Sequence, residues 1–137
     1  MLRDAQGRRK IAFDGGARRV TRGATFVNAN SALFPPVNDV MIEIPRACVI
    51  RGVRLFTTGG TGSCVVDIRR DSYGNFPPTS ADSICGAAKP TIINGNRSED
   101  TTLSGWATNL NAGDILAIVL ESSSVFRSVV VQLILEE

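Results

Sequence analysis

From residue 23 onward, hydrophobic and polar side chains alternate with a period of two in several short runs, the pattern of strands with one buried face. Such runs cover residues 25–27, 40–44, 48–57, 63–71, 115–121 and 125–136, with weaker candidates in 84–93 and a short one at 101–107. Hardly any segment repeats its apolar positions with a helical period. The alternation therefore predicts about eight strands.

Glycine, proline and asparagine separate these runs at turn-like positions. Residues 58–62, between the runs 48–57 and 63–71, predict a hairpin, and Gly52 predicts a bulge within the first run. Asn94-Gly95 is typical of a type I′ turn. Regularly spaced short strands with such turns favour an antiparallel sandwich, and about eight strands favour a jelly roll over an immunoglobulin-like fold. We therefore expect an all-β protein, an antiparallel β-sandwich with jelly-roll topology.

The alternation also separates the side chains that we expect in the core from those that we expect at the surface. In the runs 63–71 and 125–136 the side chains predicted to point inward are Cys64, Val66, Ile68, Val129, Val131, Leu133 and Leu135. Asp67 is predicted to point outward, as are its neighbours Val65 and Arg69.

Basic residues are concentrated at the N-terminus. Residues 1–22 contain seven basic and two acidic residues (7 − 2 = +5), whereas the rest contains 8 basic and 11 acidic residues, or −3. We therefore divide the chain into an extended basic arm, residues 1–22, and a single β-sandwich domain, residues 23–137. The side chains through which we expect the arm to dock are Arg8, Arg9, Lys10, Arg18, Arg19 and Arg22. An acidic protein surface suits such an arm. Nucleic acid is less favoured, because the body has no basic surface interleaved with aromatic residues.

The sequence also bears on the compartment. No apolar block follows the N-terminal charges, and no apolar run approaches the roughly 20 residues that cross a bilayer. We therefore expect neither a signal peptide nor a membrane span, and folding in a cytoplasm. The three cysteines, Cys48, Cys64 and Cys85, are widely spaced and odd in number, which predicts buried thiols rather than disulfides or zinc ligands.

The chain contains no histidine, which excludes the Ser/His/Asp and Cys/His arrangements of nucleophilic catalysis. Glu99-Asp100 is the one internal pair of adjacent acids, and neighbouring side chains in an extended segment point apart. Asp67, Asp71 and Asp82 could approach one another around a cation, but we expect no metal site. These observations predict a non-enzymatic domain without a cofactor.

The remaining candidate for chemistry is an aromatic surface at the long loop after residue 71. Tyr73, Asn75 and Phe76 lie in this loop, and Trp106 is the one tryptophan of the chain. If these side chains are exposed together, they form a stacking platform for a sugar. The interpretation that we favour is that Trp106 and Phe76 pack beneath the loop.

Two groups of motifs follow one another in the second half of the chain. The first runs from Asp67-Ile68 through Tyr73-Gly74-Asn75-Phe76-Pro77-Pro78-Thr79 to Ala81-Asp82-Ser83-Ile84. The second comprises Lys89-Pro90-Thr91, Thr102-Leu103-Ser104-Gly105-Trp106, Ala112-Gly113-Asp114-Ile115-Leu116 and the β-rich end Val129-Val130-Val131-Gln132-Leu133. In this order, over roughly residues 64–136, they resemble a small β-sandwich module of tailed-bacteriophage virion proteins, of the tail-fibre, baseplate or capsid-decoration type. The chain departs from that pattern at Arg69-Arg70, where the family usually has Trp-Lys.

The resemblance implies a structural protein of the virion, made in the bacterial host cytoplasm and docked through its arm onto other capsid or tail proteins. Because exposed sheet edges favour symmetric assembly, we expect a homo-oligomer, and specifically a homotrimer. Capsid decoration and a place in the tail fibre or baseplate stay open as alternatives. A different hypothesis is a carbohydrate-binding adhesin that recognises a host-surface glycan through Tyr73, Asn75, Phe76 and Trp106.

Overall fold

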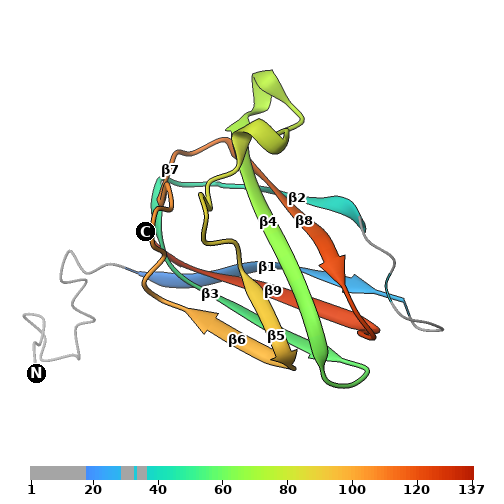
Figure 1. The fold of residues 1–137 in the computed structure, drawn as a ribbon. Helices are drawn as coiled ribbons and strands as arrows, with labels where there is room; N and C mark the ends of the chain where they lie inside the picture. The colour runs from blue at the N-terminus through green and yellow to red at the C-terminus, as the bar shows by residue number, and fades with distance from the viewer. Residues whose placement is uncertain (1–17, 29–32, 34–36) are drawn as a thin grey trace, which may run out of the picture.

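Two antiparallel sheets face each other in the computed structural model, which describes residues 18–28, 33 and 37–137 (Figure 1). The strands are β1 (Arg19–Val27), β2 (Val37–Glu43), β3 (Cys48–Thr58), β4 (Gly62–Ser72), β5 (Thr91–Gly95), β6 (Arg97–Asp100), β7 (Asn109–Leu110), β8 (Asp114–Ser123) and β9 (Ser128–Glu136). The helical residues in these ranges belong to two short 3-10 turns, η1 (Tyr73–Asn75) and η2 (Ser80–Asp82). The prediction of an all-β sandwich is confirmed.

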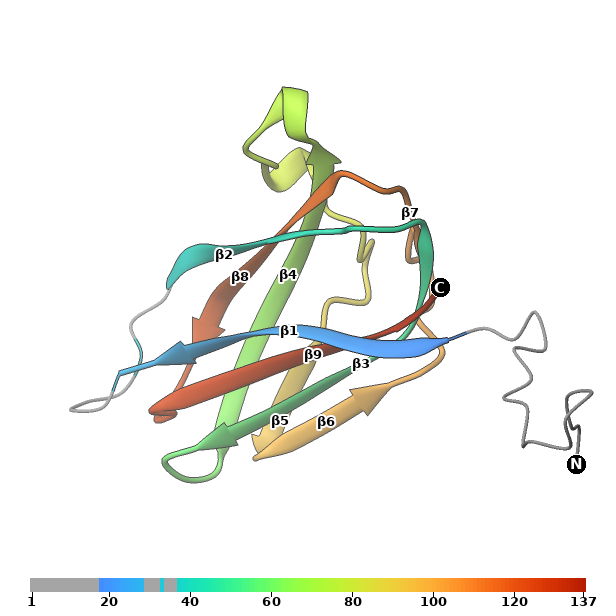
Figure 2. The same cartoon turned by 180° about the vertical axis from the view of Figure 1, so that it is seen from behind.

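The strand order is that of a jelly roll. One sheet has the order β1-β9-β3-β6, with the two-residue strand β7 also paired to β3, and the other has the order β2-β8-β4-β5. The first four strands alternate between the sheets, so the chain winds around the sandwich instead of returning within one sheet (Figure 2). This winding distinguishes a jelly roll from a simple meander. The described residues form nine strands where the sequence predicted about eight: β6 falls outside every predicted run, and the short candidate at residues 101–107 forms no strand.

The core lies between the two inner faces and is built by the alternation seen in the sequence. In β9 the burial pattern alternates along the whole strand, and Val129, Val131, Leu133 and Leu135 are all buried. The inward residues predicted for β4, which are Cys64, Val66 and Ile68, are buried as well. Phe126, just before β9, is fully buried in the same core.

Two features of the first sheet bear on the predicted boundaries. The register between β3 and β9 shifts between Ile50 and Gly52, which confirms the bulge. β1, in contrast, is longer than expected: it pairs with β9 from Arg19 to Val27, so residues 19–22 belong to the sheet rather than to a free arm. An edge strand can carry charged side chains and still form its backbone hydrogen bonds, so the polar composition of residues 19–22 gave no sign that they belong to a strand.

The predicted hairpin between the runs 48–57 and 63–71 is wrong. β3 pairs with β9, β6 and β7, whereas β4 pairs with β8 and β5 in the other sheet. The turn at residues 58–62 therefore crosses from one sheet to the other. Gly59 makes this crossing possible, because its φ of 101° suits glycine and a Cβ there would lie 2.7 Å from the Arg127 nitrogen.

The prediction of a type I′ turn at Asn94-Gly95 is also wrong. β5 and β6, which flank the pair, lie in different sheets, and of the two residues Asn94 alone has a positive φ, 48°. A type I′ turn needs positive φ at both central residues.

The weak strand candidate 84–93 survives only as β5. Residues 84–90 instead follow β4 irregularly: the Ile84 amide donates to the Ile68 carbonyl, and the Val66 amide donates to the Pro90 carbonyl. The expectation that Asp67 faces solvent is wrong, since its side chain is 1% exposed. The segment that packs beside β4 here covers the outer face on which Asp67 lies.

Candidate functional site

The six basic docking residues divide into two groups. Arg8, Arg9 and Lys10 lie outside the described residues. Arg18 and Arg19 flank the start of β1, and Arg22 lies within it, all three exposed. The Arg18 carbonyl accepts a hydrogen bond from the Glu137 amide, and the Arg19 guanidinium lies 4.0 Å from the Glu136 carboxylate. The root of the arm is therefore tied to the end of β9.

The most buried polar group of the described chain is the Asp67 carboxylate on β4. Its Oδ1 accepts hydrogen bonds from the Ser83 hydroxyl at 2.6 Å and from the Ile68 amide at 3.0 Å, and its Oδ2 accepts one from Arg69 Nε at 3.0 Å. A buried carboxylate is tolerated only with such partners. The contact with Ser83 attaches the far end of the loop 72–83 to the strand from which the loop starts.

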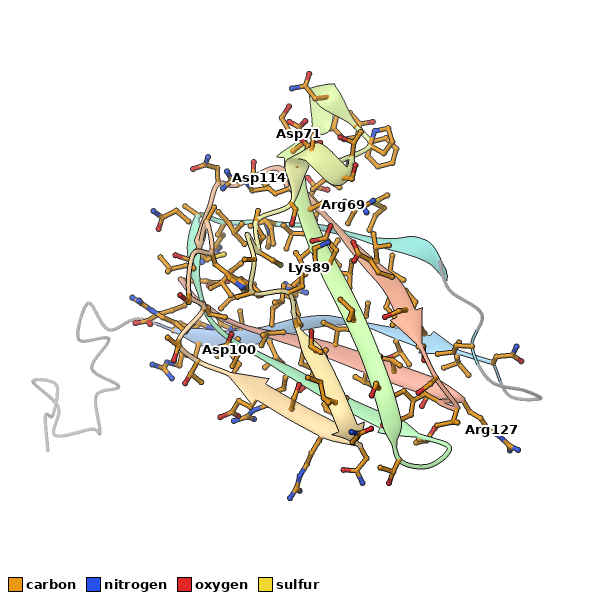
Figure 3. The ribbon with its side chains drawn as sticks, in the orientation of Figure 1. Arg69, Asp71, Lys89, Asp100, Asp114 and Arg127 are labelled. Atoms are coloured by element: carbon orange, nitrogen blue, oxygen red, sulfur yellow. The ribbon has the colours of Figure 1, made fainter. Side chains whose placement is uncertain are left out.

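Beside Asp67, the charges continue as an alternating series. Arg69 also lies 3.8 Å from Glu121 on β8, and Glu121 accepts two hydrogen bonds from Lys89, at 2.8 and 3.0 Å. These bonds raise the pKa of the Lys89 amine above its ordinary value. Figure 3 shows Arg69 and Lys89 together over β4. The two acids and two bases of this cluster balance in charge, so it adds little net charge to the surface. Its contact with the loop is the hydrogen bond between Asp67 and Ser83.

The loop presents two of the predicted aromatic side chains to solvent. Tyr73 is 76% and Phe76 52% exposed, and together with Met41, Glu43 and Ile115 they line an open pocket of about 530 Å³. The expectation that Phe76 packs beneath the loop is therefore wrong. Asn75, in the same turn, is also exposed, and its side-chain amide donates to the Asp71 carboxylate at 3.2 Å.

The sheet register sets the electrostatics of this pocket. Glu43 on β2 and Asp71 on β4 both lie opposite Ile115 on β8, so the two carboxylates flank Ile115 on the outer face. In the described part of the chain neither carboxylate forms a salt bridge. Figure 3 places Asp71 where β4 meets the loop. The pocket thus combines two exposed aromatic rings with the Glu43 carboxylate in its lining, and the Asp71 carboxylate lies beside it, with Oδ1 bonded to the Ser72 amide and to the Asn75 side chain.

Trp106 is not part of this surface. It is 8% exposed, and its indole Nε1 donates a hydrogen bond of 2.8 Å to the Ala88 carbonyl. It is therefore buried in the core, as expected, but its bonded neighbour lies in the segment 84–90 rather than in the loop 72–83. The aromatic platform expected from the sequence is reduced to Tyr73 and Phe76.

A second exposed surface was missed by the sequence reasoning. On the outer face of β1-β9-β3-β6, Phe56 lies between Val130 on β9 and Arg97 on β6, and it lines a shallow depression of about 500 Å³ with Arg54 and Glu99. The charged residues of this face are Arg19, Arg51, Arg54, Arg97, Glu99 and Glu136. The signal was available, because the alternation in residues 48–57 puts Phe56 on the side opposite Leu55.

The described residues offer no grouping for metal or thiol chemistry. Among them no cluster of three or more His, Cys, Asp or Glu side chains could hold a metal ion. All three cysteines are free and buried, and burial raises the pKa of each thiol, that of Cys85 to about 12. Such thiols stay protonated and unreactive near neutral pH. No described helix is long and apolar enough to span a bilayer.

Comparison with known proteins does not assign the chain to a family. No protein-family model, no curated protein and no solved structure matches the chain. The arguments for function therefore rest on the residues themselves.

Proposed function

We propose that this protein is a non-enzymatic structural component of a tailed-phage virion, a surface-exposed jelly roll docked to the particle through its N-terminal arm. The motif resemblance over residues 64–136 supports this class. The arm is the docking element, and other capsid or tail proteins are its partners. Capsid decoration and tail-fibre or baseplate attachment are the two addresses to be distinguished.

The observation that carries the proposal is the way in which the arm is rooted. β1 pairs with β9 over nine residues, from Arg19 to Val27, and the Glu137 amide bonds back to Arg18. A tether that continues directly into a paired strand is anchored to the sheet by the hydrogen bonds of that strand pair. This is the construction expected of a part that is held on a particle by its N-terminus.

The open surfaces of the sandwich support an assembled state. β1, β6, β2 and β5 end the two sheet orders, and unpaired strand edges invite association. Phe56 and Val130 sit on the outer face of one sheet within a rim of arginine and glutamate. A symmetric homotrimer on the particle is the assembly that we propose for these surfaces.

The test is to locate the protein on purified particles and to ask whether the arm is needed there. Antibody labelling seen by electron microscopy should mark either the head or the tail tip. Because residues 19–22 are part of β1, the informative truncation removes residues 1–17 and leaves the sheet intact. We expect the truncated protein to fold but to be lost from particles. Unlabelled particles would refute the virion assignment, and full incorporation of the truncated protein would refute the role of the arm.

A further inference from the structure

The pocket formed by Tyr73, Phe76, Met41, Glu43 and Ile115 has the chemistry of a site for a basic side chain. Aromatic faces attract ammonium and guanidinium groups, and the attraction is strongest where a carboxylate stands nearby. Here two rings are exposed, Glu43 lines the pocket without a salt bridge in the described residues, and Asp71 lies across from the pocket residue Ile115 on the neighbouring strand, also without a salt bridge there.

The chain itself contains a segment of matching charge. Arg8, Arg9 and Lys10 are consecutive, and no acidic residue lies between Asp4 and Asp14. We propose that the segment Arg8–Lys10 of the same chain docks in the Tyr73–Phe76 pocket. This goes beyond the proposed docking of the arm onto the particle, and rests on that function only for its purpose: the contact would hold the arm on its own domain until a partner surface competes for it.

Charge distinguishes this pocket from the other exposed surface. The outer face of the opposite sheet carries four arginines (Arg19, Arg51, Arg54 and Arg97) against Glu99 and Glu136, and both glutamates already have arginine partners. A basic segment would meet net repulsion there. At the loop pocket it meets the Glu43 carboxylate, which forms no salt bridge among the described residues, with Asp71 nearby.

The position of the root of the arm and the length of chain before it bear on a contact within one molecule. β1 and β2 are in contact and run in opposite directions, so the arm enters β1 at the end of the sandwich where β2 leaves at Glu43 (Figure 2). Lys10 precedes Arg18 by eight residues (18 − 10), which span at most roughly 26–29 Å when extended. Attachment to the same chain also gives the segment an effective concentration on the order of millimolar, so a weak contact is sufficient.

The experiment uses the full chain with a nitroxide attached at Ala12→Cys. The three native thiols are buried with raised pKa values, so the introduced thiol is labelled selectively. We expect paramagnetic broadening of the amides of Tyr73, Asn75 and Ile115, with the Phe56 amide unaffected. Glu43→Gln should reduce the broadening roughly two- to fivefold, as should 0.5 M salt, because the contact is exposed.

Glu99→Gln is the matched control, since it makes the same charge change on the opposite sheet and should leave the broadening unchanged. A mixture of isotope-labelled chain without nitroxide and unlabelled chain with nitroxide should show no broadening, which identifies the contact as intramolecular. Broadening in this mixture would overturn the proposal in favour of a second copy as the occupant. Broadening that is absent, or that falls on Phe56 instead, would overturn it outright. So would glycan-array binding that is lost in Tyr73→Ala and occurs without arm broadening, since the pocket would then be a sugar site. Each of these results is independent of where antibody labels the particle.

Discussion

Replacing Asp67 with alanine tests whether the buried carboxylate holds the loop onto the sandwich. The change removes three hydrogen bonds, from the Ser83 hydroxyl, the Ile68 amide and Arg69 Nε. It also leaves the Arg69 guanidinium, whose side chain is 17% exposed, with Glu121 at 3.8 Å as its remaining charged partner. Removing one member of a buried ion pair costs about 3–5 kcal/mol. Because Glu121 and some solvent still reach Arg69, we expect the lower end, about 3 kcal/mol.

The expected change in melting temperature follows from the size of the chain. An unfolding entropy of about 2.1 cal/mol/K per residue gives about 0.29 kcal/mol/K for the chain of 137 residues, so 3 kcal/mol corresponds to a decrease of about 10 °C. Urea unfolding followed by the fluorescence of Trp106 gives the free energy directly, and circular dichroism gives the melting temperature. Trp106 suits this purpose because its indole bonds to Ala88, in the segment next to the network.

Two further variants make the Asp67 result specific. Glu99→Ala removes a carboxylate whose ion pair with Arg54 is half-exposed, and it should cost no more than about 1 kcal/mol. Ser83→Ala should cost about 1–2 kcal/mol, and its effect should largely vanish in the Asp67→Ala background, because both changes remove the same hydrogen bond. A loss below about 1 kcal/mol for Asp67→Ala would refute the argument that this carboxylate anchors the loop.

Three other outcomes follow from the structure. Burial raises the pKa of the Cys85 thiol from 9.0 to about 12, so between these pH values the folded state keeps a proton that the unfolded state loses. The free energy of unfolding should therefore fall as the pH rises above 9, and Cys85→Ala should lessen this slope by up to about 1.4 kcal/mol per pH unit in urea titrations. An identical slope in the variant would contradict the raised pKa. Val125 is 53% exposed and has a φ of 52°, in a tight turn closed by a hydrogen bond from the Phe126 amide to the Ser124 carbonyl. Because a β-branched residue is strained at positive φ and asparagine tolerates it better, Val125→Asn should raise the free energy of unfolding by about 0.5–1 kcal/mol. A lower free energy of unfolding would argue against strain at this residue. Tyr73→Ala should change the unfolding free energy by less than about 0.5 kcal/mol, whereas Trp106→Ala should cost about 3–5 kcal/mol; equal effects by thermal circular dichroism would contradict their assigned burial.

The candidate site was only partly visible in the sequence. The sequence indicated the loop 72–83 as a candidate surface, and Tyr73 and Asn75 are exposed there, but so is Phe76, which was expected to pack beneath the loop. Glu43, the residue that gives the pocket its charge, was not predicted, because it lies about 30 residues before the loop (73 − 43) and reaches it only through the pairing of β2 with β8. Trp106 could not be assigned from its residue type alone, since an indole with a buried hydrogen-bond partner and an indole at the surface are both common.

The sequence by itself determined the class of fold. An alternation of apolar and polar residues places one face of each strand in the core whatever its partners are, so the inward residues of β4 and β9 could be read directly. Partners are a different matter, because a turn such as 58–62 can either return a chain within a sheet or carry it across to the opposite one, and both choices bury the same apolar face. Only the tertiary structure decided that β3 and β4 belong to opposite sheets, and that Asp67 on an outward position is buried by the segment that packs against β4. The physical reason is that alternation reports the environment of each side chain relative to its own strand, whereas pairing and outer-face burial depend on which distant segments pack beside it.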